Sequence, residues 1–188
     1  MRKILCAGIL AFSSLTAFAQ QEPACGQEAL AAQLTRIQRE KELGVIWLPN
    51  AGLQALITPE AIANTNAQAF FTALDRYVML GVLDISGTHS RAELVEGLSL
   101  RIAGSETTLT PLDPSTLDPI VQQLFRKILA PGLEKGIEIV FFLNRDENGQ
   151  PFLGQETKAF TVTLGEDSFT WTLPIACLAS VPNTHETR

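Results

Sequence analysis

The strongest constraint on the fold of this chain is a pair of alternating segments near its C-terminus. In residues 160–164 (FTVTL) and again in residues 169–173 (FTWTL), apolar side chains alternate with threonines, and Gly165-Glu166-Asp167 lies between the two segments. Successive side chains of a strand point to opposite faces, so the pattern predicts two antiparallel strands with one buried apolar face and one solvated threonine face. Such a hairpin belongs to an antiparallel sheet or a small β-sandwich.

Other segments predict further strands of the same kind. Residues 77–85 (YVMLGVLDI) are apolar almost throughout, which is typical of a central strand that is buried on both faces. Residues 98–103 (LSLRIA) alternate more regularly, and residues 107–112 are their expected hairpin partner. Residues 137–143 (IEIVFFL) predict one more strand.

The first helix is predicted near the N-terminus. Leu30, Leu34 and Ile37 recur at helical spacing among polar residues, which predicts an amphipathic helix over residues 27–42. Residues 45–48 then read as a short strand, and residues 53–57 fit either a strand or a helical turn.

Two later signals predict further helices. Residues 58–60 (Thr-Pro-Glu) start a helix that continues to about residue 75, and Asp118 is the expected N-cap of a helix that begins at Pro119. The predicted fold class is therefore α+β. It consists of an antiparallel sheet or small β-sandwich, with an N-terminal helix and one or two further helices packed on it.

The first 19 residues have the three parts of a secretory signal peptide. Arg2 and Lys3 supply the positive charge, residues 4–15 are mostly apolar, and a small-x-small cleavage site ends at Ala19. The apolar segment is shorter than the roughly 20 residues that cross a bilayer, which disfavours a membrane anchor. We predict cleavage near Ala19 and a periplasmic or secreted mature protein.

The mature chain is expected to be one globular domain over residues 20–188, with a polar tail from about residue 180 and no transmembrane anchor. Loss of Arg2 and Lys3 changes the formal net charge from −6 to −8. An acidic surface disfavours nucleic acids and anionic membranes as partners, because both are themselves negatively charged.

Removal of the signal peptide also removes Cys6 and leaves Cys25 and Cys177 near opposite ends of the domain. In an oxidising compartment the simplest interpretation is a disulfide between them. It would close a loop of roughly 150 residues, for which chain entropy gives a stabilisation of about 5 kcal/mol as an upper figure. Buried free thiols and a catalytic cysteine are the alternatives.

The densest group of catalytic residue types lies in residues 84–90 (DISGTHS), directly after a predicted buried strand. Asp84, Ser86, His89 and Ser90 supply a carboxylate, two hydroxyls and an imidazole. A loop at the end of a strand is a reasonable place for a site. However, a Ser-His-Asp arrangement is rarely formed by residues so close in sequence. A solvated loop is the simpler interpretation, and a ligand-binding or catalytic loop is the alternative.

A second candidate site lies after residues 137–143. Asn144, Asp146 and Asn148 alternate like the first ligands of an EF-hand calcium loop. The match then fails, because Gln155 stands where a bidentate glutamate is needed and predicted strands flank the segment. Asn148 followed by glycine favours a tight turn, with calcium binding as the alternative. Residues 146–154 are similar to hairpins of transthyretin-like and other extracellular sandwich domains, a likeness too short to indicate a function.

No motif predicts a cofactor. Phosphate-binding and dinucleotide-binding glycine loops are absent from the sequence. A zinc set is also disfavoured, because His185 lies in the polar tail, His89 is the one other histidine, and the two cysteines of the mature chain are expected to form a disulfide. The leading hypothesis is a non-enzymatic exported binding or envelope-associated protein, with an unknown protein or small ligand as its partner. The alternative is a small secreted hydrolase that uses residues 84–90. An inhibitor or chaperone-like protein has the same sequence signature as the leading hypothesis.

Overall fold

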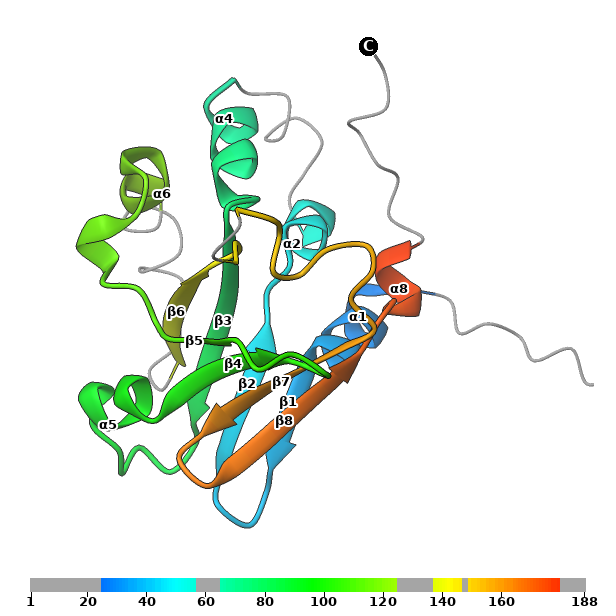
Figure 1. Cartoon of the computed structure of the whole chain (residues 1–188). Coiled ribbons are helices and arrows are strands. Elements are labelled where there is room, and N and C mark those ends of the chain that lie inside the picture. The colour runs from blue at the N-terminus through cyan, green and yellow to red at the C-terminus, as the bar shows by residue number, and fades with distance from the viewer. Residues whose placement is uncertain (1–24, 57–64, 125–136, 147–148, 180–188) are drawn as a thin grey trace, which may run out of the picture.

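The computed structural model describes residues 25–56, 65–124, 137–146 and 149–179 (Figure 1). The predicted signal peptide, the helix-start signal at residues 58–60, Asn148 and the predicted polar tail lie outside these residues.

The fold is α+β, as predicted, and contains two four-stranded antiparallel sheets. Sheet A has the order β1-β2-β3-β6, with β1 at Thr35–Gln38, β2 at Leu43–Trp47, β3 at Tyr77–Asp84 and β6 at Ile137–Leu143. Sheet B has the order β5-β4-β7-β8, with β5 at Thr108–Leu109, β4 at Leu98–Ile102, β7 at Ala159–Leu164 and β8 at Asp167–Thr172.

Short helices connect and cover these strands. They are α1 (Gln27–Leu34), α2 (Asn50–Leu56), α4 (Thr65–Leu74), α5 (Arg91–Glu96), the 3-10 turn η1 (Pro114–Thr116), α6 (Pro119–Leu124) and α8 (Ala176–Ala179). As predicted, α6 is capped by Asp118, whose Oδ1 accepts a hydrogen bond from the Ile120 amide at 3.1 Å. Residues 53–56, for which the sequence left two possibilities, belong to a helix.

The larger core lies between the two sheets. The ring centroids of Trp47 in sheet A and Phe160 in sheet B are 4.9 Å apart, and Trp171 stacks on Phe160 at 5.0 Å. In β7 and β8 the apolar residues are buried and the threonines face outward, which confirms the predicted alternation. Each large side chain buried here contributes roughly 1.5–3 kcal/mol to folding.

A second core lies on the other face of sheet A. Phe70, Phe71 and Leu74 of α4 are buried there, against Met79 of β3 and Phe141 of β6. The strand over residues 77–85 was predicted from the sequence. Most of β3 is therefore covered on both faces, by sheet B on one side and by helices on the other, which explains why almost all its residues are apolar.

The N-terminal helix is shorter than predicted. α1 ends at Leu34, and the chain then forms β1, a turn in which Glu42 has φ of 53°, and β2. Ile37, expected on the buried helix stripe, lies in a strand and is 48% exposed. The physical reason is tertiary: Arg36 donates from Nε to the Thr170 carbonyl oxygen of β8 at 3.1 Å, and its guanidinium lies 5.3 Å from the centre of the Trp171 ring.

The predicted disulfide between Cys25 and Cys177 is present, with the two Cα atoms 5.2 Å apart. It joins the residue just before α1 to α8, across a sequence separation of 152 residues. The two chain ends of the described fold are thereby held together.

Candidate functional site

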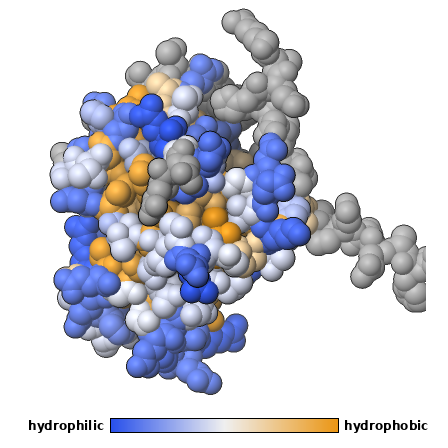
Figure 2. All heavy atoms as spheres, viewed as in Figure 1, coloured by the Kyte–Doolittle hydropathy of each residue, from blue (hydrophilic) through white to orange (hydrophobic). Residues whose placement is uncertain are grey.

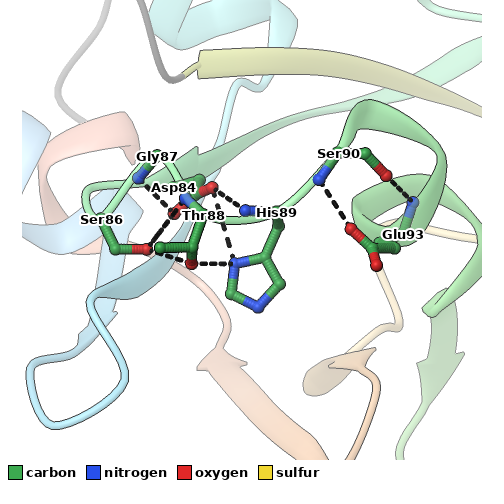
Figure 3. A network of polar contacts seen from close by, with 7 residues as sticks. All are labelled: Asp84, Ser86, Gly87, Thr88, His89, Ser90 and Glu93. Atoms are coloured by element: carbon green, nitrogen blue, oxygen red, sulfur yellow. Dashed lines mark hydrogen bonds and ion pairs between the residues drawn. The ribbon is translucent and has the colours of Figure 1, made fainter.

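Residues 84–90 leave the end of β3 as a tight loop around one buried carboxylate (Figure 3). Asp84 is 6% exposed and accepts hydrogen bonds from Ser86 Oγ at 2.7 Å, the Gly87 amide at 2.9 Å and the His89 amide at 2.8 Å. The loop therefore folds back on its first residue, and Gly87 supplies the positive φ of 66° that the turn requires.

These contacts determine the charge of Asp84. Burial on its own would raise the pKa of the carboxyl group, because it disfavours the charged form. The hydrogen bonds from Ser86, the His89 and Gly87 amides and the His89 ring outweigh burial, and together they lower the pKa to about 2. Asp84 is therefore an ionised anchor of the loop at neutral pH, rather than a proton donor.

His89 lies beside this carboxylate but is not arranged as in a proton relay. Its Nδ1 is 3.5 Å from Asp84 Oδ2 and 3.3 Å from Thr88 Oγ1, whereas the other ring nitrogen points away from the residues drawn in Figure 3. In a Ser-His-Asp site the acid and the nucleophile contact opposite nitrogens of the imidazole. In this loop, the Asp84 carboxylate and the Thr88 hydroxyl both lie next to Nδ1 of His89.

Ser90 has a different role from the other candidates. Its Oγ accepts a hydrogen bond from the Glu93 amide at 3.3 Å, and the Glu93 carboxylate accepts one from the Ser90 amide at 2.7 Å. This capping box starts α5, a helix that was not predicted from the sequence. The signal was present in the sequence, since a serine followed three residues later by glutamate is the usual mark of such a start.

The structure thus brings Asp84, Ser86 and His89 together and directs Ser90 into the helix cap. The backbone and hydroxyl groups of the loop hold one carboxylate, so the visible role of the loop is to fix the chain after β3. The hydrolase alternative stays a prediction.

The calcium candidates form a tight turn in which their oxygens bind the backbone. Asn144 Oδ1 accepts a hydrogen bond from the Leu153 amide at 2.7 Å, and Asp146 Oδ1 accepts one from the Gln150 amide at 2.8 Å. Gly149 has φ of 78°, as the turn interpretation requires. Asn148 lies outside the described residues, and within these residues no three His, Cys, Asp or Glu side chains are grouped to hold a metal ion.

A further surface feature lies on the face of sheet A that is turned away from sheet B. Ile37 is 48% exposed and Ile85 is 59% exposed. Together with three partly buried neighbours they form what we call the aliphatic surface, which consists of Ile37, Ile46, Leu83, Ile85 and Ile137. Two glycines at its centre confirm the arrangement. A Cβ built on Gly44 would lie 3.1 Å from Leu83 and 3.2 Å from Ile37, and one built on Gly81 would lie 3.5 Å from Ile137.

The opposite side of the molecule is different in character. The outward face of sheet B, which is turned toward the viewer in Figure 2, is mostly white and blue. It carries the exposed or partly exposed hydroxyl side chains of β7 and β8, among them Thr161 and Thr170, whose hydroxyls are 2.9 Å apart. The aliphatic surface therefore lies on the outward face of sheet A and not on the outward face of sheet B.

The loop and the aliphatic surface are neighbours. Ile85 directly follows Asp84, and its amide donates to the Glu42 carbonyl oxygen at 2.8 Å. On the other side of the loop, Arg91 of α5 forms an ion pair with Glu138 of β6, with Nε 2.7 Å from Oε1. The Ile85–Glu42 hydrogen bond therefore connects the start of the loop to the turn before β2, and the ion pair connects the helix that follows the loop to β6, at the border of the aliphatic surface.

Comparison with models of known protein families finds no match, and comparisons with curated proteins and with solved structures find no significant similarity. In the described part of the chain, no helix is long and apolar enough to span a membrane.

Proposed function

We propose that this protein is an exported, non-enzymatic binding protein that recognises another protein through its aliphatic surface. The observation that carries the proposal is the exposure of Ile37 of β1 and of Ile85, directly after β3, on one face of sheet A. Gly44 of β2 lies between Ile37 and Leu83 of β3 and leaves the space between these two side chains open. Single exposed hydrophobic side chains are common, whereas several gathered on one face are typical of an interaction site. A protein partner suits a face made of aliphatic side chains on neighbouring strands.

The anchored loop supports the same proposal. Ile85 has its backbone fixed by the Glu42 carbonyl on one side and by the Asp84 network on the other. A segment whose backbone is already held in place loses little backbone freedom on binding, which favours affinity. In this proposal Asp84 and His89 are positioning residues, and their chemistry is used to fix the shape of the surface.

The disulfide supports the exported location. Disulfides form and persist mainly in the periplasm, the secretory pathway and the extracellular space. Together with the predicted signal peptide, the Cys25–Cys177 bond favours a protein that acts outside the cytoplasm.

Charged substitutions in the aliphatic surface test the proposal. We expect Ile37→Asp and Ile85→Asp to remain folded and to lose the partner that the wild-type protein retains from an extract of exported proteins of the source cell. Leu143→Asp is the matched control, because Leu143 is also 43% exposed but lies at the other end of β3, opposite Tyr77. The control should retain the partner.

Three outcomes would overturn the proposal. The first is that Leu143→Asp loses the partner as completely as the two surface variants do. The second is that Ile37→Asp and Ile85→Asp both retain the partner. The third is hydrolysis of an ester or peptide substrate by the wild-type protein that disappears in His89→Ala, which would favour the hydrolase alternative instead.

A further inference from the structure

Helix α1 is short and has weak ends. It has 8 residues, its N-cap is Gly26, whose lack of a side chain leaves the cap without a side-chain hydrogen bond, and its last turn contains no basic residue. Helices of this length are marginal in water on their own, so α1 depends on its contacts with the rest of the protein.

Helix α1 contacts the core between the sheets and is joined to α8 and β8 by hydrogen bonds. Leu30 and Leu34 are buried in the core between the sheets. The indole Nε1 of Trp171 donates to the Leu34 carbonyl oxygen at 3.1 Å, and the Cys177 amide donates to Gln33 Oε1 at 3.2 Å. The one covalent link of α1 to a distant part of the described fold is the disulfide from Cys25.

The two sheets are built without α1 or α8. β3 pairs with β2 and β6, and β7 pairs with β4 and β8. We infer that the Cys25–Cys177 disulfide is a redox-sensitive clasp: its reduction releases α1 and α8 from the fold and uncovers the apolar surface beneath them, while both sheets stay folded. The uncovered surface would include the part of the core that Leu30 and Leu34 contact in the closed state.

The chemistry of opening follows from the different exposure of the two cysteines. Cys25 is an exposed residue, whereas Cys177 is 2% exposed. One thiolate of a dithiol reductant attacks Cys25 Sγ, the disulfide breaks, and Cys177 leaves as a thiolate that takes up a proton. The second thiol of the reductant then attacks the mixed disulfide, which frees Cys25 as a thiol and converts the reductant into a cyclic disulfide.

The same difference in exposure makes opening slow. A thiolate in an apolar environment is disfavoured, so the buried Cys177 is a poor leaving group and opening is slow. The protein therefore has two states that differ in one apolar surface, and the redox state of the compartment selects between them.

Hydrogen exchange detected by mass spectrometry tests the clasp in the whole oxidised protein, with and without dithiothreitol. After about one minute of labelling, we expect the exchange of residues 27–34 and 176–179 to be at least about tenfold faster in the reduced protein. The strands β3 and β7 should remain unexchanged over the same time in both states.

The double variant Cys25→Ser/Cys177→Ser is the control for effects of the reductant itself. It should exchange like the reduced wild-type protein and should not change further when dithiothreitol is added. If reduction leaves the exchange of residues 27–34 unchanged, the disulfide is not a clasp. If β3 and β7 exchange together with α1, the disulfide stabilises the whole fold and the inference is equally wrong.

Discussion

The indole Nε1 of Trp171 donates a hydrogen bond to the carbonyl oxygen of Leu34 at 3.1 Å, which joins β8 to the last residue of α1. Trp171 is fully buried, so the Leu34 carbonyl has no simple replacement for this donor. Removing one partner of a buried hydrogen bond leaves the other partner unsatisfied, at a cost of about 1–3 kcal/mol.

Trp171→Phe is therefore expected to lower the free energy of unfolding by more than a loss of ring volume explains. Trp47→Phe is the matched control, because Trp47 contacts the same Phe160 ring and its indole nitrogen makes no hydrogen bond within the described part of the chain. Denaturant unfolding should show that the Trp171 variant is less stable than the Trp47 variant by about 1–3 kcal/mol. Equal losses would mean that the hydrogen bond contributes nothing.

Asp84 predicts a specific pH dependence of stability. Its pKa of about 2 in the folded protein is below the ordinary value of 3.8, so the folded state favours the ionised form. The resulting stabilisation is complete above about pH 4 and is lost as the pH falls toward 2. We expect it to amount to about 1–2 kcal/mol.

Asp84→Asn should remove this dependence. Between pH 2 and about 5, the unfolding free energy of the variant should change less with pH than that of the wild-type protein. Asp113→Asn is the comparison for an exposed capping carboxylate, since hydrogen bonds from Ser115 also lower the pKa of Asp113; its effect on the pH dependence should be smaller than that of Asp84→Asn. If the unfolding free energies of the wild-type protein and of Asp84→Asn change with pH at the same slope, the carboxylate does not have this anchoring role.

The strands were largely predictable from the sequence because their side-chain pattern is a direct consequence of burial. Alternation in residues 160–164 predicted β7, and the almost uninterrupted apolar character of residues 77–85 predicted a strand buried on both faces. The change from helix to strand at Thr35 was not predictable from local pattern. It depends on contacts of Arg36 with Thr170 and Trp171, which are more than 130 residues away in the sequence.

The site was predictable only in part, for a similar reason. The residue types of the loop identified it as a candidate, but only the three-dimensional turn shows that Asp84 is bound by backbone amides and that Ser90 caps a helix. The aliphatic surface was missed because Ile37 was assigned to a helix stripe. It lies near Leu83 only once β1 and β3 flank β2 in the same sheet.

The capping role of Ser90 predicts a change in stability without a change in binding. Ser90→Ala should lower the free energy of unfolding by about 0.5–2 kcal/mol, because the Glu93 amide loses its acceptor. Ser90→Asp should restore most of this stability, since an aspartate also caps a helix. Thermal unfolding of the three proteins checks the prediction. An alanine variant as stable as the wild-type protein would show that the cap is unimportant.

The two glycines of the aliphatic surface predict opposite responses to one added methyl group. A Cβ on Gly44 would lie 3.0 Å from the backbone oxygen of Arg36, which cannot move without disturbing the pairing of β1 with β2. A Cβ on Gly81 would have its nearest neighbours, on Ile137, Ile139 and Ile46, at 3.5 to 3.7 Å, which is ordinary contact. Denaturant unfolding should show that Gly44→Ala costs about 1–3 kcal/mol, whereas Gly81→Ala is neutral or stabilising by up to about 1 kcal/mol. If both variants lost the same stability, the close approach of β1 to β2 at Gly44 would not be the cause.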